Sequence, residues 1–113
     1  MKKNISLLLL ISMLTACGGM NYISTKPYSD SLRARCISAL PQDQQAEPKA
    51  RTNCAQSAAS MIHLAKRLYE TKAKADLAAC SEQHSDKTQI DQCFQKQQEA
   101  FYTAWIERKP REN

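Results

Sequence analysis

The sequence predicts an all-α fold: a small three-helix up-down-up domain with a long central helix, stapled by two disulfides, on a flexible N-terminal tether. The chain contains no valine, and Ala, Gln, Lys, Leu and Glu dominate after residue 30, a composition that favours helices over strands. Apolar residues recur at spacings of three and four. Four cysteines beyond residue 17 provide the covalent links.

Length and charge exclude several classes of protein. A chain of 113 residues forms one small domain at most, and its formal charge is +5. Without the first 16 residues, 14 basic and 11 acidic residues remain, a charge of only +3. Of the 38 apolar residues that remain, 14 are Ala, five are Cys and only 19 are large, so covalent reinforcement is expected. These features exclude a multidomain enzyme, a membrane-spanning protein and a strongly basic nucleic-acid binder.

Residues 1–16 are predicted to be a lipoprotein signal peptide. A short cationic start is followed by an apolar run over residues 5–14, which is too short to span a bilayer. The run ends in Leu14-Thr15-Ala16-Cys17-Gly18, which resembles a bacterial lipobox. The resemblance implies cleavage before Cys17, a diacylglyceryl group on its sulfur and acylation of the new amino group. These acyl chains would hold the protein on a membrane.

Residues 17–28 are predicted to be the lipidated tether, because they contain a glycine pair, small polar residues and a proline. Gly18 follows the modified cysteine. There is no Asp at that position, where it would act as the inner-membrane retention signal of enteric-type sorting. We therefore expect a lipid anchor in the outer membrane, with the protein facing the periplasm.

The first helix is expected to start at Ser29 or Asp30, either of which can act as N-cap, and to stop before Pro41. After a polar link, Pro48 can occupy the first turn of a second helix that meets no breaker until about Cys80. Its predicted core stripe alternates spacings of four and three. The stripe consists of Cys54, Ala58, Met61, Ala65, Leu68, Ala75 and Ala79, widened by Ile62, Leu64, Tyr69 and Leu77.

The third helix is predicted to begin at a Thr88 cap and to end by Pro110, so that the helical domain covers 29–109 and residues 110–113 form a tail. Its core face is predicted to contain Ile90, Cys93 or Phe94, Gln97, Phe101, Ala104 and Trp105.

Tyr102 and Ile106 lie off this stripe, and we expect them to face a protein partner or the membrane interface.

Cys36, Cys54, Cys80 and Cys93 are predicted to form two disulfides, because an exported domain meets an oxidising compartment. A bond from Cys54 to Cys80 would join helix ends about 39 Å apart, whereas a disulfide needs α-carbons within about 7 Å. Adjacent helix ends favour Cys36 with Cys54 and Cys80 with Cys93. The crossed pairing of Cys36 with Cys80 and Cys54 with Cys93, and four free thiols, remain as alternatives.

No catalytic or metal site is predicted. The carboxylates stand singly at helix-surface spacings, and neither His63 nor His84 falls in a recognised metal-ligand spacing. A metal site on Cys80, His84 and Cys93 is the weaker alternative to a disulfide. We therefore expect a protein that is not an enzyme, with no cofactor, no small-molecule substrate and no nucleic-acid partner.

The stretch from Tyr28 to Ala55 resembles small plasmid-borne entry-exclusion lipoproteins of the EexN type. Tyr28, Leu32, Cys36 and Asn53-Cys54-Ala55 match the family's pattern, over about a third of the chain. The family usually stops soon after its second cysteine, whereas this chain continues. The resemblance implies an envelope protein that blocks redundant conjugative DNA entry by contacting a donor secretion component.

Two other functions fit a small helical lipoprotein. A pilotin-like chaperone would grip a helix of a secretin subunit in an apolar groove on the second helix. A periplasmic inhibitor or immunity protein would neutralise a hydrolase. All three functions act by protein-protein interaction in the envelope, and the genes beside this one would separate them.

Overall fold

The computed structural model describes residues 20–108, which form an all-α, up-down-up arrangement, as predicted. Its elements are α2 (Lys26–Ala39), the short 3-10 turn η1 (Gln42–Gln44), α3 (Pro48–Gln83) and α4 (Lys87–Ile106). The predicted signal peptide, the lipidation site Cys17 and the tail at 110–113 lie outside the described residues.

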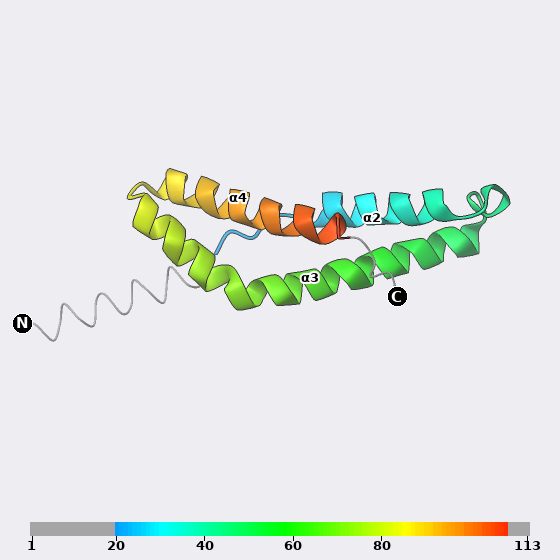
Figure 1. Ribbon diagram of the computed structural model, residues 1–113, viewed down its shortest axis with the longest axis horizontal. Coiled ribbons are helices and arrows are strands. Elements are labelled where there is room, and N and C mark those ends of the chain that lie inside the picture. Colours follow the sequence, from blue (N-terminus) through cyan, green and yellow to red (C-terminus); the bar gives the residue numbers. More distant parts are fainter. Residues whose placement is uncertain (1–19, 109–113) are drawn as a thin grey trace, which may run out of the picture.

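The two shorter helices lie almost in line with each other on one side of α3 (Figure 1). With 36 residues, α3 is about 54 Å long at 1.5 Å per residue. α2 covers its first half and α4 its second half, and each packs mainly on α3. Both shorter helices therefore make most of their contacts with α3.

The helix starts differ from those predicted. Thr25 precedes α2 and Asp86 precedes α4, whereas Ser29 or Asp30 and Thr88 were expected. The Asp86 carboxylate accepts a hydrogen bond from Gln89 N at 3.4 Å, and a carboxylate is a better N-cap than a threonine hydroxyl.

The start of α3 at Pro48 agrees with the sequence prediction. The Glu47 carboxylate before it accepts a hydrogen bond from Ala50 N at 3.2 Å. A proline is favourable at this first position, because its missing N–H has no partner within the helix there.

The two predicted disulfides are confirmed. Cys36 is bonded to Cys54 with α-carbons 5.5 Å apart, and Cys80 to Cys93 with α-carbons 5.7 Å apart. Each bond joins α3 near one of its ends to the helix beside it. The crossed pairing, the free thiols and a metal site that uses Cys80 and Cys93 are thereby excluded.

The packed body begins earlier than the predicted boundary between residues 28 and 29. Met20, Ile23 and Tyr28 pack against the core cluster, and α2 already begins at Lys26. The prediction that residues 20–28 belong to the tether is therefore wrong. We call Met20–Thr25 the N-terminal strap.

The core stripe of α3 has a different phase from the predicted one. Ile62 and Tyr69 are buried, whereas Met61 and Leu68, which were expected in the core, are exposed. The buried residues of this helix are Cys54, Ala58, Ile62, Ala65, Tyr69, Ala73 and Cys80. Their spacing follows three turns in eleven residues, which is close to the ordinary period of an α-helix, rather than two turns in seven.

Candidate interaction surface

Tyr69 lies at the centre of an aromatic cluster between α3 and α4. Its ring centroid is 5.1 Å from that of Phe101, 6.0 Å from Tyr102 and 6.3 Å from Phe94. Its hydroxyl donates a hydrogen bond to the Asp76 carboxylate at 3.0 Å. Burial, and then this hydrogen bond to a carboxylate, raise the pKa of Tyr69 well above its ordinary value. The phenol therefore stays protonated and acts as a structural donor.

Gln98 connects the N-terminal strap to this cluster. Its side chain is fully buried, and its Oε1 accepts a hydrogen bond from Ile23 N at 2.9 Å. Its Nε2 donates to the Asn21 carbonyl oxygen at 2.9 Å. Both polar groups of the Gln98 amide thus form hydrogen bonds with backbone groups of the strap. Gln97, which the sequence predicts on the core face, is exposed.

The structure corrects the prediction that Tyr102 presents itself to a partner. Tyr102 is only 3% exposed, and its ring stacks on that of Tyr28 with centroids 5.3 Å apart. The buried face of α4 consists of residues at intervals of four: Phe94, Gln98 and Tyr102. Tyr28 and its neighbours pack on this face, so Tyr102 is covered. Burial also raises the pKa of Tyr102.

Ile106, the other predicted partner residue, is half-buried at the end of α4. Its carbonyl oxygen accepts a hydrogen bond from Arg35 Nη1, so that the end of α4 is joined to α2. Neither residue of the predicted partner surface is thus freely presented.

A different group of apolar side chains is exposed on the middle of α3. Met61 is 44% exposed, Leu64 is 52% exposed and Leu68 is 43% exposed. Residues three and four apart lie on the same side of a helix, so these three side chains form one continuous stripe. Sequence analysis had assigned all three to the core of the domain. Exposed large apolar groups in a row are typical of a surface that binds another molecule.

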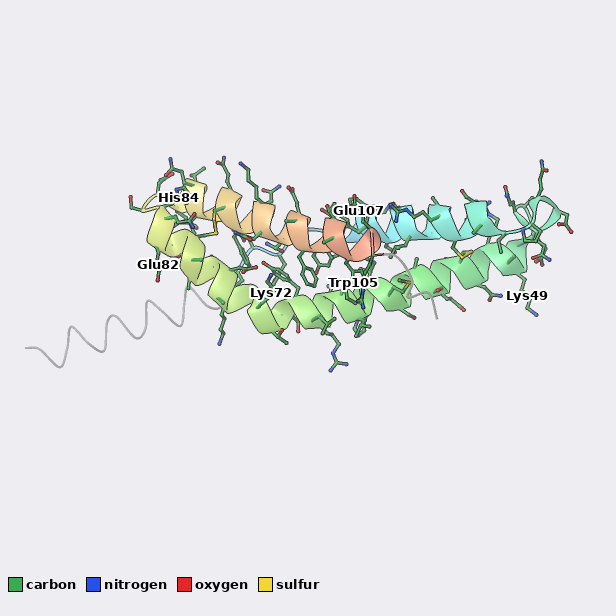
Figure 2. All side chains as sticks on the ribbon, in the orientation of Figure 1. Lys49, Lys72, Glu82, His84, Trp105 and Glu107 are labelled. Atoms are coloured by element: carbon green, nitrogen blue, oxygen red, sulfur yellow. A yellow bond between two sulfur atoms is a disulfide. The ribbon has the colours of Figure 1, made fainter. Side chains whose placement is uncertain are left out.

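Aromatic and basic side chains lie together near the end of α4. Figure 2 shows Lys72 of α3 and Trp105 of α4 in the space between the two helices. The Lys72 ammonium lies 5.6 Å from the Phe101 ring centroid, and the Arg108 guanidinium lies 5.2 Å from that of Trp105. Cations over aromatic faces are favourable. Trp105 Nε1 is buried without a hydrogen-bond partner.

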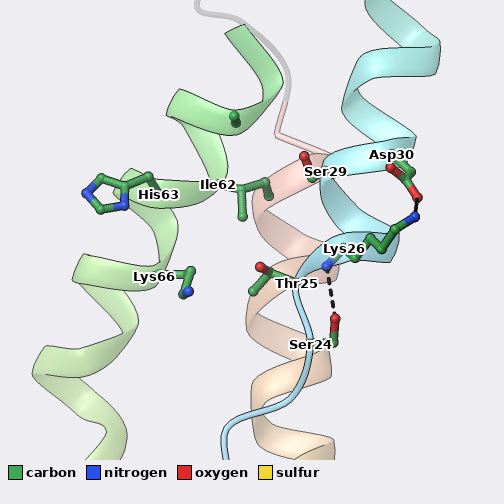
Figure 3. Close-up of a pocket in the computed structure, with 9 residues that line it drawn as sticks. Ser24, Thr25, Lys26, Ser29, Asp30, Ile62, His63 and Lys66 are labelled. Carbon is green, nitrogen blue, oxygen red and sulfur yellow. Dashed lines mark hydrogen bonds and ion pairs between the residues drawn. The ribbon is translucent and has the colours of Figure 1, made fainter. Parts of the chain in front are cut away.

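An open hollow of about 410 Å³ lies between α3 and the start of α2. In Figure 3, His63 projects from α3 on the side away from α2, so its imidazole does not join the other side chains. The Lys26 ammonium pairs with the Asp30 carboxylate at 2.9 Å, and this bond lowers the pKa of Asp30. The lining residues are Ser24, Thr25, Lys26, Ser29, Asp30, Ala59, Ile62, His63 and Lys66. This arrangement brings no general acid, base and nucleophile together.

The described residues form neither a metal-ion cluster nor a membrane-crossing helix. Between residues 20 and 108, no three His, Cys, Asp or Glu side chains are grouped so that they could hold a metal ion. None of the three helices combines the length and the apolar character that crossing a membrane requires.

Comparisons of the chain with protein-family models, with curated proteins and with solved structures find no match.

Proposed function

We propose that this protein is a lipid-anchored protein of the outer membrane that acts in the periplasm by binding another envelope protein, in the manner of an entry-exclusion lipoprotein. The membrane attachment is the lipid on Cys17, which the lipobox-like residues 14–18 support. The partner is a component of a secretion or conjugation machine. The protein itself carries out no reaction.

The observation that carries the binding function is the exposed stripe of Met61, Leu64 and Leu68. Covering apolar surface contributes roughly 25 cal/mol per Å². Two neighbouring half-exposed leucines and a methionine therefore offer a partner a substantial gain. Cys54, Ala58 and the other core residues hold α3 through an adjoining face, so the stripe is presented on a rigid support.

Photo-cross-linking in the native envelope tests this proposal. A photoreactive amino acid replaces Leu64 in the stripe or, as the matched control, the exposed Glu70 on another side of α3. We expect a specific adduct from position 64 and none from position 70. Equal adducts from both positions, or none from either, would contradict binding through the stripe.

The anchor is tested separately by metabolic labelling with a palmitate analogue. We expect label on the intact chain and none on the Cys17→Ser variant. A labelled Cys17→Ser protein, or an unlabelled intact protein, would refute lipidation at Cys17.

A pilotin-like role is the second candidate, because the exposed stripe lies on a long helix and can pack against a helix of a partner. The mass of the cross-linked protein separates the two functions. A secretin subunit identifies a pilotin, and a component of the conjugation machine identifies entry exclusion.

A further inference from the structure

α3 carries two apolar patterns with different periods. The buried pattern includes Cys54, Ala58, Ile62, Ala65, Tyr69 and Ala73, at successive spacings of 4, 4, 3, 4 and 4 residues. It repeats every eleven residues, and α2 and α4 cover it.

The second pattern is exposed at every position and repeats every seven residues. It runs from Ser57 through Met61, Leu64, Leu68, Thr71 and Ala75 to Ala78, at alternating spacings of four and three. We call these seven residues the α3 seam. A narrow stripe with this alternation is the contact pattern of a coiled coil, in which every seam residue meets the partner helix. The larger side chains lie at the centre of the seam, and the smaller ones toward its ends let a partner backbone approach.

The charges beside the seam are of one sign. The flanking positions are Ser60, Arg67, Lys74 and Ser81 on one side, and Ala58, Ala65, Lys72 and Ala79 on the other. Of the second set, Ala58 and Ala65 are buried in the core of the domain itself. None of these eight residues is acidic. Lys72 already pairs with Asp76 at 3.8 Å, whereas Arg67 and Lys74 form no ion pair with any carboxylate of the described residues. In coiled coils, the charges at these flanking positions select the partner.

We propose that the α3 seam binds one amphipathic helix of a partner protein, with apolar residues in its own heptad seam and Glu or Asp at the flanking positions. This inference rests on the proposed function, because it takes the stripe as the surface that the partner covers. It adds the chemistry of the partner: a helix with acidic flanks. Arg67 and Lys74 supply the matching cations, which favour correct partners over wrong ones.

Two other occupants fit these observations less well. A second copy of the chain would bring Arg67 and Lys74 against a seam with the same cations and no flanking carboxylate. A lipid surface favours a broad face with bulky residues such as Trp and Phe, whereas the large residues of this seam are limited to Met61, Leu64 and Leu68.

The test uses the full chain in the presence of neutral phosphatidylcholine vesicles and two labelled probe peptides. Each peptide is a helix of about four heptads with leucine in its seam. One carries Glu at all flanking positions and the other carries Lys. Fluorescence anisotropy measures binding. We expect the Glu peptide to bind at least about tenfold more tightly than the Lys peptide, and the difference to shrink as salt is added.

Variants of the chain locate the binding site. Leu64→Gln and Arg67→Glu should each weaken binding of the Glu peptide by about tenfold or more. Glu99→Gln, at an exposed position of α4, should leave it unchanged. Circular dichroism verifies that each variant keeps its helices, and these exposed positions are not required for the core.

Three results would overturn the inference. They are equal binding of both peptides, loss of peptide binding when phosphatidylglycerol vesicles replace the neutral ones, and a stable dimer of the chain in analytical ultracentrifugation that Leu64→Gln dissociates. If any of these occurs while position 64 still cross-links to an envelope protein, the acidic helix is wrong and the binding function stands. If position 64 gives no specific cross-link, the binding function itself fails.

Discussion

Replacing Gln98 with leucine should release the N-terminal strap from the body. Leucine has nearly the volume of glutamine and can pack beside Phe94 and Tyr102, but it offers neither a donor nor an acceptor. The variant therefore removes the two 2.9 Å hydrogen bonds to Ile23 N and the Asn21 carbonyl oxygen. These two backbone groups would be left buried without partners if the strap stayed in place.

The expected loss of stability follows from these two bonds. A hydrogen bond contributes about 1 kcal/mol net, and an unsatisfied buried group costs about 1–3 kcal/mol. If the strap moves into water, both backbone groups bind water and the larger penalty is avoided. We therefore expect a loss of about 2–3 kcal/mol in the free energy of unfolding, with α3 and α4 otherwise intact.

Amide hydrogen exchange and urea unfolding measure the two effects. The Ile23 amide should lose its protection in Gln98→Leu, and amides in the middle of α3 should keep theirs. Gln97→Leu is the matched control, because Gln97 is an exposed neighbour on the same helix. A Gln98→Leu protein in which Ile23 remains protected would refute the claim that the amide of Gln98 holds the strap.

Three further predictions concern the rest of the fold. Replacing Cys36 and Cys54 with serine should cost about 3 kcal/mol in the chain-entropy estimate, and hydrogen exchange should show α2 loosening first, because that helix has no buried residue of its own. The free energy of unfolding should fall as the pH rises above 10.0, the ordinary tyrosine pKa, because unfolded Tyr69 loses its proton more readily than the folded residue. Urea titrations at increasing pH should show a smaller fall for Tyr69→Phe. An equal dependence of the unfolding free energy on pH in both proteins would contradict this prediction. Asp86→Ala should lower the free energy of unfolding by about 1 kcal/mol, because α4 loses its N-cap. Asp86→Asn should be nearly neutral, and thermal melts of both variants measure the difference.

Local signals were sufficient for the helices and the disulfides. Pro48 and the polar links mark helix ends by their effect on the adjacent backbone, so the number and order of the helices could be predicted. A bond between Cys54 and Cys80 could then be excluded, because a continuous helix keeps their α-carbons farther apart than a disulfide allows. The pairing thus followed from helix length rather than from cysteine count.

The phase of α3 could not be predicted from its apolar residues, because two stripes share this helix. Met61 and Leu68 fit an alternation of four and three as well as any core residue does, and they are large and apolar. The burial of Tyr69 depends on Phe94 and Phe101, which approach from α4. Such contacts between distant parts of the chain leave no mark on local periodicity.

The strap was missed for the same reason. The glycine, serine, threonine and proline residues in and beside the strap are typical of a flexible linker. Gln98, which binds the strap, lies 75 residues away from Ile23 in the sequence. Only the completed fold brings the two together. The burial of Tyr102, which depends on Tyr28 beside this strap, went unpredicted with it.

The packed strap changes what the proposed anchor can do. A tether to Tyr28 would let the body move about 36 Å from a lipid on Cys17, whereas packing from Met20 leaves three residues, which reach about 11 Å. A lipid at Cys17 would then keep one part of the body close to the bilayer, and α3, about 54 Å long, would set how far the other parts lie from it. The α3 seam would be presented within a narrow range of heights above the membrane. A partner helix whose position in the envelope is itself fixed could meet it there with a smaller loss of freedom than on a long, flexible tether.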